Sequence, residues 1–174
     1  MRGGWWRLWV GLCVAALVVG PAGAQERKRM PTAVIEMAAG SEIVIELYPE
    51  DAPKTVESFI TLSKKGFYNG LSFHRVVPGF VVQGGDPKGD GTGGPGYKLP
   101  AEFNKRKHLR GAVAMARSQD PNSAGSQFYI CFQPAPHLDN QYTIFGQVVR
   151  GMEAVDQIKV GDKMKTIRID EPKP

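Results

Sequence analysis

Residues 73–86 read Phe-His-Arg-Val-Val-Pro-Gly-Phe-Val-Val-Gln-Gly-Gly-Asp, a dense mixture of apolar and polar side chains. It places a guanidinium (Arg75), an aromatic ring (Phe80) and an amide (Gln83) within a few residues of one another. Such a mixture is compatible with a ligand-binding surface. It is equally compatible with two ordinary β-strands that carry a solvated arginine.

The apolar run that follows the Pro-Gly turn is typical of a strand over residues 80–83. Because side chains alternate along a strand, Val81 and Gln83 are expected on one face. Phe80 and Val82 are expected on the other.

A second segment, residues 125–130, reads Gly-Ser-Gln-Phe-Tyr-Ile. The same alternation places Gln127 and Tyr129 together on one face. The two segments therefore offer two amides, an arginine and two aromatic rings for a shared surface.

Short strand patterns continue along the rest of the chain, separated by Gly- and Pro-rich loops. Besides 80–83, the predicted strands span residues 32–37, 42–48, 72–76, 112–116, 128–132, 142–149 and 166–170. A helix is predicted after Pro53, with Asp51 as its candidate cap, and a second over residues 152–159. We expect a mainly β fold: a closed eight-stranded antiparallel β-barrel capped by two α-helices.

The first 24 residues have the pattern of a secretory signal peptide. Arg2 and Arg7 precede an apolar run at residues 8–19, and Ala22-Gly23-Ala24 is a small-residue cleavage site. The run is shorter than the ~20 residues of a spanning helix, which makes a retained membrane anchor the weaker alternative. We predict a signal peptide at 1–24, a flexible segment at 25–31, one domain at 32–174, and export to the periplasm or the medium.

Removal of residues 1–24 would leave 150 residues with a net charge of +3, against +5 for the 174-residue chain. So small an excess is weak evidence for nucleic acid, and no nucleic-acid partner is expected. The predicted mature chain keeps a single cysteine, Cys131, so it cannot form an internal disulfide. Cys131 lies in an apolar strand pattern and is expected in the core.

Motifs for other chemistries are weak. Residues 89–94 have the spacing G-x-G-x-x-G, but Pro95 and Gly96 follow where a dinucleotide site needs a helix, so a flexible surface loop is predicted. The three histidines are scattered, without the spacing of a metal site, and no G-x-S-x-G elbow is present. We expect no metal, no cofactor and no covalent intermediate.

From residue 32 to 169 the chain resembles the cyclophilins, the barrel-shaped peptidyl-prolyl cis/trans isomerases. The resemblance rests on residues 73–86 and on later motifs in the family's order: 91–94, 115–118, 125–128, 138–139 and 145–146. It implies an isomerase that rotates X-Pro bonds of proline-containing polypeptides without a cofactor. With the signal pattern, it predicts a monomer that assists folding of exported proteins.

Site residues follow from the resemblance position by position. It makes Arg75 catalytic, with Phe80 and Gln83 beside it. The remaining substrate-binding residues it implies are His74, Val81, Met115, Ala116, Arg117, Gln127, Tyr129, His137, Leu138 and Tyr142. The alternative is a cyclophilin-like binding module that holds proline-containing segments with little turnover; Arg75 together with Gln83 favours the enzyme.

Four positions depart from the family's pattern. His137 and Tyr142 stand where vertebrate members have tryptophan and histidine, so weak inhibition by cyclosporin is expected. Tyr129 replaces a phenylalanine and adds a hydroxyl, which we expect to face the groove. Val81 replaces a methionine and slightly shrinks one wall of the pocket.

Overall fold

The computed structural model describes residues 30–171. The predicted signal peptide and most of the predicted flexible segment lie outside the described residues. The strands are β1 (Thr32–Met37), β2 (Glu42–Leu47), β3 (Arg75–Val77), β4 (Val81–Gly84), β5 (Ala112–Met115), β6 (Phe128–Cys131), β7 (Ile144–Arg150) and β8 (Met164–Asp170). The helices are α1 (Pro53–Lys64) and α2 (Met152–Asp156), with a 3-10 turn, η1, at Pro136–Leu138.

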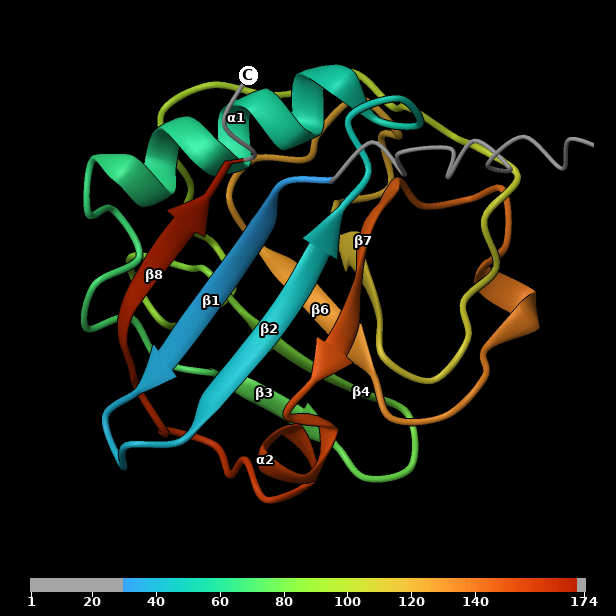
Figure 1. Cartoon of the computed structure of the whole chain (residues 1–174). Helices are drawn as coiled ribbons and strands as arrows, with labels where there is room; N and C mark the ends of the chain where they lie inside the picture. The colour runs from blue at the N-terminus through green and yellow to red at the C-terminus, as the bar shows by residue number, and fades with distance from the viewer. Residues whose placement is uncertain (1–29, 172–174) are drawn as a thin grey trace, which may run out of the picture.

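All eight strands belong to one antiparallel sheet in the order β3-β4-β6-β5-β7-β2-β1-β8. The sheet curls, so that β8, β1 and β2 face β3, β4 and β6 across the interior, and α1 and α2 lie at opposite ends (Figure 1). The mainly β prediction with two helices is confirmed.

The predicted closure of the barrel is overstated. Between the edge strands β3 and β8, the described residues show a single isolated bridge, from Ser72 to Lys163. The short β3 is paired along its length with β4, and it forms no ladder with β8. The sheet is a curled half-barrel with a seam at this edge.

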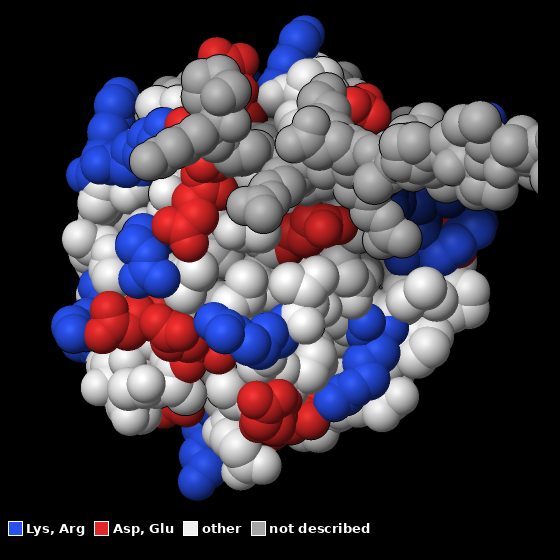
Figure 2. Space-filling view, viewed as in Figure 1, with Lys and Arg blue, Asp and Glu red and all other residues white. Residues whose placement is uncertain are grey.

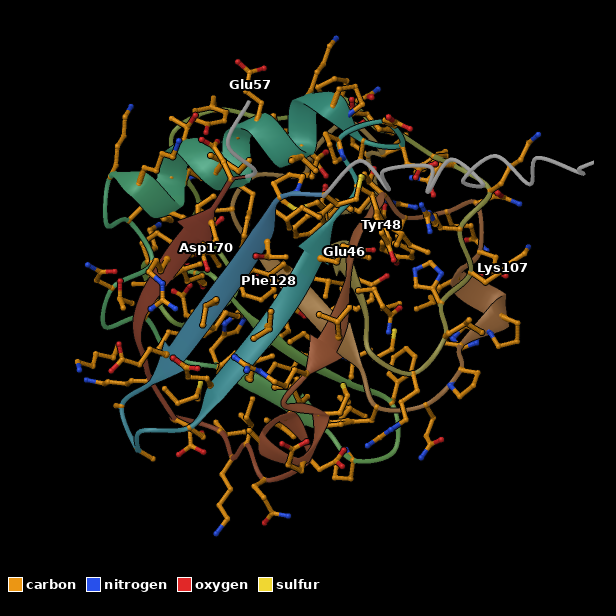
Figure 3. All side chains as sticks on the ribbon, in the orientation of Figure 1. Glu46, Tyr48, Glu57, Lys107, Phe128 and Asp170 are labelled. Atoms are coloured by element: carbon orange, nitrogen blue, oxygen red, sulfur yellow. The ribbon has the colours of Figure 1, made fainter. Side chains whose placement is uncertain are left out.

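Alternating side chains divide the strands between two apolar clusters. The larger, here called the main core, fills the curl and includes Val82, Phe128 and Ile130. Phe128 lies behind β1 and β2, inside the sheet (Figure 3), where its ring meets Phe59 of α1 edge-on at 5.7 Å between centroids. A smaller outer cluster lies on the opposite face of β4, β5 and β6 and includes the first residue of β7. Its members are Val81, Ala112, Ala114, Tyr129, Cys131 and Ile144, with Phe80, Ala116, Leu138 and Tyr142 packed against it.

Helix α1 is capped by a residue far away in the sequence. Ala52 occupies the N-cap position and offers no side-chain bond, so the prediction of Asp51 as the cap is wrong. The carboxylate of Glu102 accepts hydrogen bonds from the backbone N–H groups of Lys54 (3.0 Å) and Thr55 (2.8 Å). Those donors have no partner within the helix, and a negative charge is favourable there. Asp51 instead pairs with Arg106 at 2.9 Å.

Acidic and basic side chains alternate on the face formed by β1, β2 and β8, without a large area of one sign (Figure 2). Cross-strand pairs account for part of this pattern, such as Lys165 with Glu36 at 2.6 Å and Arg150 with Glu42 at 3.4 Å. Exposed pairs of this kind contribute little to stability. Among residues 30–171, no helix has the length and apolar character needed to cross a membrane.

Candidate active site

The hairpin of β3 and β4 brings Arg75 and Gln83 together. The register pairs these two residues directly across the strands, on either side of the Pro78-Gly79 turn. Arg75 Nη1 donates a hydrogen bond to Gln83 Oε1 at 3.3 Å. Arg75 is exposed, whereas Gln83 is half-buried, so the amide holds a guanidinium that remains open to a ligand.

A cavity of about 220 Å³ lies beside this pair, over the outer cluster. Its wall brings together nine of the predicted site residues: Arg75, Phe80, Val81, Gln83, Ala116, Arg117, Tyr129, Leu138 and Tyr142. Aromatic and aliphatic groups form most of the wall, and the Arg75 guanidinium contributes a fixed positive charge. The cavity therefore suits a small apolar ring attached to a polar backbone.

Phe80 reaches this cavity although the alternation predicted otherwise. Alternation alone placed it on the face of Val82, and that prediction is wrong, whereas the resemblance had placed it in the pocket. Strand β4 begins only at Val81, so the strand period does not apply to Phe80. Its ring packs on the outer cluster and stacks on His137, with 5.5 Å between centroids.

The other predicted residues are not part of the wall of this cavity. Met115 is buried in the main core, on the opposite face of β5 from Ala114. His137 contacts the cavity through the ring of Phe80. Both ring nitrogens of His74 are buried, without a hydrogen-bond partner among the described residues.

Gln127 joins the first cavity to a second one of about 430 Å³. Its Nε2 donates to the carbonyls of Gly91 (3.0 Å) and Gly93 (2.9 Å), and its Oε1 accepts from Gln83 Nε2 at 2.9 Å. The two cavities share Gln83, Ala116 and Arg117. A hydrogen-bonded chain thus runs from the glycine-rich loop through two glutamines to Arg75.

The glycine-rich loop is organised by the buried carboxylate of Asp86. Asp86 accepts hydrogen bonds from the backbone N–H groups of Lys88 (2.9 Å) and Gly91 (2.5 Å). A Cβ at Gly93 would lie 2.0 Å from the same carboxylate, so only glycine fits there. The prediction of a surface loop missed that it forms a wall of the second cavity.

Arg117 differs from Arg75 in how its guanidinium is used. Its Nε and Nη2 donate to the Gln141 carbonyl at 3.0 and 2.9 Å, and its Nη1 donates to the Ser118 carbonyl at 2.9 Å. The group also lies over the Tyr142 ring, 4.5 Å from the centroid. Backbone carbonyls therefore occupy much of the donor capacity of Arg117, and Arg75 is the better candidate to donate to a ligand.

The hydroxyl of Tyr129 does not face the groove, contrary to the prediction. It forms a 3.0 Å hydrogen bond with Nε2 of the buried His108, whose Nδ1 lies 3.0 Å from Asp139 Oδ1. His108 and Asp139 were not among the residues predicted for the site. Asp139 belongs to the 138–139 motif, but no local pattern pointed to His108, because its contacts with Tyr129 and Asp139 span 21 and 31 residues of chain.

Comparison with known proteins fits this geometry. Residues 32–173 match the family described as cyclophilin type peptidyl-prolyl cis-trans isomerase/CLD. The chain belongs to this family.

The alignments of this cyclophilin with its curated relatives cover nearly the whole length of each relative. The peptidyl-prolyl cis-trans isomerase of Synechococcus elongatus is 46% identical over 142 residues, which are 80% of this chain and 97% of the relative. Peptidyl-prolyl cis-trans isomerase B of Bacillus subtilis is 48% identical over 143 residues, 81% of this chain and 99% of the relative.

A solved Cryptosporidium parvum cyclophilin, crystallised in the presence of the dipeptide Ala-Pro, superimposes with a TM-score of 0.75 at 32% identity, covering 81% of this chain and 99% of that one. The expected activity, peptidyl-prolyl cis-trans isomerisation, is confirmed at the level of the family and its named relatives.

Proposed function

We propose that X-Pro peptide bonds rotate in the cavity between Arg75, Phe80 and Tyr129. One observation carries the assignment: the guanidinium of Arg75 shares a cavity of about 220 Å³ with apolar and aromatic side chains of the outer cluster. The apolar wall holds the proline ring while the chain on the other side of the bond turns.

The chemistry requires no bond to break. Resonance gives the X-Pro bond a barrier of ~18–20 kcal/mol, and uncatalysed exchange takes ~10–100 s. In the twisted state the proline nitrogen regains its lone pair and can accept a hydrogen bond. Arg75 can donate that bond, because a guanidinium stays protonated and Gln83 fixes its orientation. Each ~1.4 kcal/mol by which the site favours the twisted state gives about tenfold in rate.

The substrates we propose are proline-containing polypeptides. The Cryptosporidium relative was crystallised in the presence of Ala-Pro, a minimal form of such a substrate. The second cavity adjoins the first through Gln83, Ala116 and Arg117, so a residue that flanks the proline could enter it.

Arg75→Ala tests the assignment. We expect kcat/KM in a protease-coupled proline-peptide assay to fall by about tenfold or more, with the unfolding midpoint unchanged, because Arg75 is exposed. Arg75→Lys should also be impaired, since a flexible point charge does not replace the planar fork. Full activity of Arg75→Ala would overturn the mechanism. Slow exchange by the unmodified protein, with tight peptide binding in NMR, would identify a binding module instead.

We further propose that the protein is exported and, as a monomer, assists the folding of other exported proteins. The signal pattern at residues 1–24 supports this proposal. Mass spectrometry of the protein from exporting cells should show an N-terminus at Gln25, and Ala24→Leu should block processing. A mature chain that still begins at Met1 would contradict export through this signal.

A further inference from the structure

We propose that His108 and Asp139 are positioning residues for the isomerisation: they hold the hydroxyl of Tyr129 and thereby fix the ring that forms one wall of the cavity. The inference rests on the proposed function of the cavity around Arg75. Neither residue lines that cavity, so both act through Tyr129.

Tyr129 connects the cavity to a buried polar pair. Its ring lines the cavity and is packed in the outer cluster, where it meets Tyr142 edge-on at 5.8 Å between centroids. Its hydroxyl lies 3.0 Å from Nε2 of His108, whose side chain is fully buried. A buried hydroxyl with one good partner is expensive to displace, so this bond restrains the ring.

Asp139 fixes the imidazole of His108 from the other side. Its Oδ1 contacts both Nδ1 (3.0 Å) and the backbone N–H (2.9 Å) of His108, and Lys107 pairs with its Oδ2 at 3.2 Å. Asp139 follows Leu138, which itself lines the cavity. One short segment therefore supplies a cavity wall and the anchor of the polar pair.

The protonation states of Asp139 and His108 define the direction of the two hydrogen bonds made by the His108 ring. The backbone N–H of His108 is the largest of the influences that lower the pKa of Asp139 to about 2, so Asp139 is a carboxylate and His108 Nδ1 must donate to it. Burial lowers the pKa of His108 despite the opposing effect of Asp139, so the neutral ring prevails at neutral pH. Its Nε2 then accepts the proton of the Tyr129 hydroxyl.

Acid reverses this last bond. Once His108 is protonated, Nε2 becomes a donor, and the Tyr129 hydroxyl must turn its own proton toward another acceptor. The titratable or charged groups that face this network are Asp139, His137, Tyr129, Cys131, Tyr142, Lys107 and Arg117. Burial raises the pKa of both Tyr129 and Cys131, so neither titrates between pH 5 and 8.

The ring grips proline in the planar and the twisted states alike, so its restraint supports binding more than rate. Loss of binding that is uniform along the reaction raises KM and leaves kcat nearly unchanged. For Tyr129→Phe we expect KM to rise by about three- to tenfold, the worth of one ordinary hydrogen bond. In the unmodified protein, KM should also rise as the pH falls below the ordinary histidine range, and the variant should lack this rise.

The experiment compares KM and kcat between pH 5 and 8 for four proteins: unmodified, Tyr129→Phe, His108→Asn and the double variant. Asparagine retains a donor for Asp139 but is too short to reach Tyr129, so it cuts the same bond from the other side. Both single variants should raise KM equally, and the double variant should add less than twofold, about 0.4 kcal/mol.

Tyr142→Phe is the matched control, because it removes the same group from another ring of the same cavity. It should keep the acid-dependent rise of KM. A merely structural role for Tyr129 would not predict that Tyr129→Phe loses this rise while Tyr142→Phe keeps it. Additive effects in the double variant, or an unchanged KM and pH profile in Tyr129→Phe, would overturn the inference. Should His108→Asn fail to fold, Tyr129→Phe decides alone.

Arg75→Ala in the same assay separates this inference from the proposed function. If Arg75→Ala loses activity while Tyr129→Phe behaves like the unmodified protein, only the positioning role fails. If Arg75→Ala remains fully active, the proposed function fails first.

Discussion

The two faces of strands β4, β5 and β6 differ more than their common backbone suggests. Inside the curl, cross-strand neighbours are both large: Met115 faces Phe128, and Val113 faces Ile130. On the outer face, the neighbour of Tyr129 on β5 is the small Ala114, and its neighbour on β4 is Gln83, which lines the cavity. Large pairs fill the interior, whereas a large ring beside a methyl group leaves space for a ligand.

Polar groups follow the same division. Aromatic side chains surround Phe128. The outer cluster instead borders Arg75 and Gln83 at the cavity, and its Tyr129 bonds to the His108–Asp139 pair. Substitutions inside the curl should therefore reduce stability, and substitutions at the outer face should reduce activity. The predictions below test this separation.

Phe128→Ala should have the largest effect. The Phe128 ring lies within 5.7–6.3 Å, between centroids, of the rings of Phe59, Tyr68 and Phe73, and it is fully buried. The free energy of unfolding should fall by about 3–5 kcal/mol, as measured by urea titration. Phe128→Leu should cost clearly less, because it leaves a smaller void. A loss below about 1 kcal/mol would show that the interior is not closely packed.

Gln127→Ala should have an intermediate effect, and mainly on activity. The change removes the link between the glycine-rich loop and Gln83, so Gln83 holds Arg75 less firmly. We expect kcat/KM to fall by about threefold, less than for Arg75→Ala, with stability changed by less than about 1 kcal/mol. Ser123→Ala is a comparison in the second cavity, outside the chain that reaches Arg75. If Gln127→Ala were as active as the unmodified protein, Gln83 would need no support from Gln127 to hold Arg75.

Local pattern predicted the parts of the site that depend on nearby residues. The strands were found within a few residues of their observed bounds, and the Arg75–Gln83 pair follows from one hairpin. The pattern alone still allowed a solvated Arg75, and the resemblance to cyclophilins supplied its role. Phe80 was misplaced because the alternation was extended one residue beyond the strand.

The rest depends on contacts between distant segments, which no local pattern encodes. Glu102 caps a helix 47 and 48 residues before it, and His108 meets Tyr129 and Asp139 only after β5 and β6 have paired. Local pattern could not predict the seam either, because whether β3 pairs with β8 depends on the curl of the whole sheet.

Cys131 gives the smallest expected effect and the sharpest test of what the outer face is. It points to the functional side of β6, two residues from Tyr129, yet it is fully buried. Burial raises the pKa of its thiol to about 12, so at pH 8 only about one molecule in 10⁴ carries the reactive thiolate. Iodoacetamide should leave Cys131 unmodified in the native protein and alkylate it fully in urea, as peptide mapping by mass spectrometry would report. Rapid native labelling would mean that the outer cluster opens in solution, and a cavity wall that opens could not hold a proline ring in place.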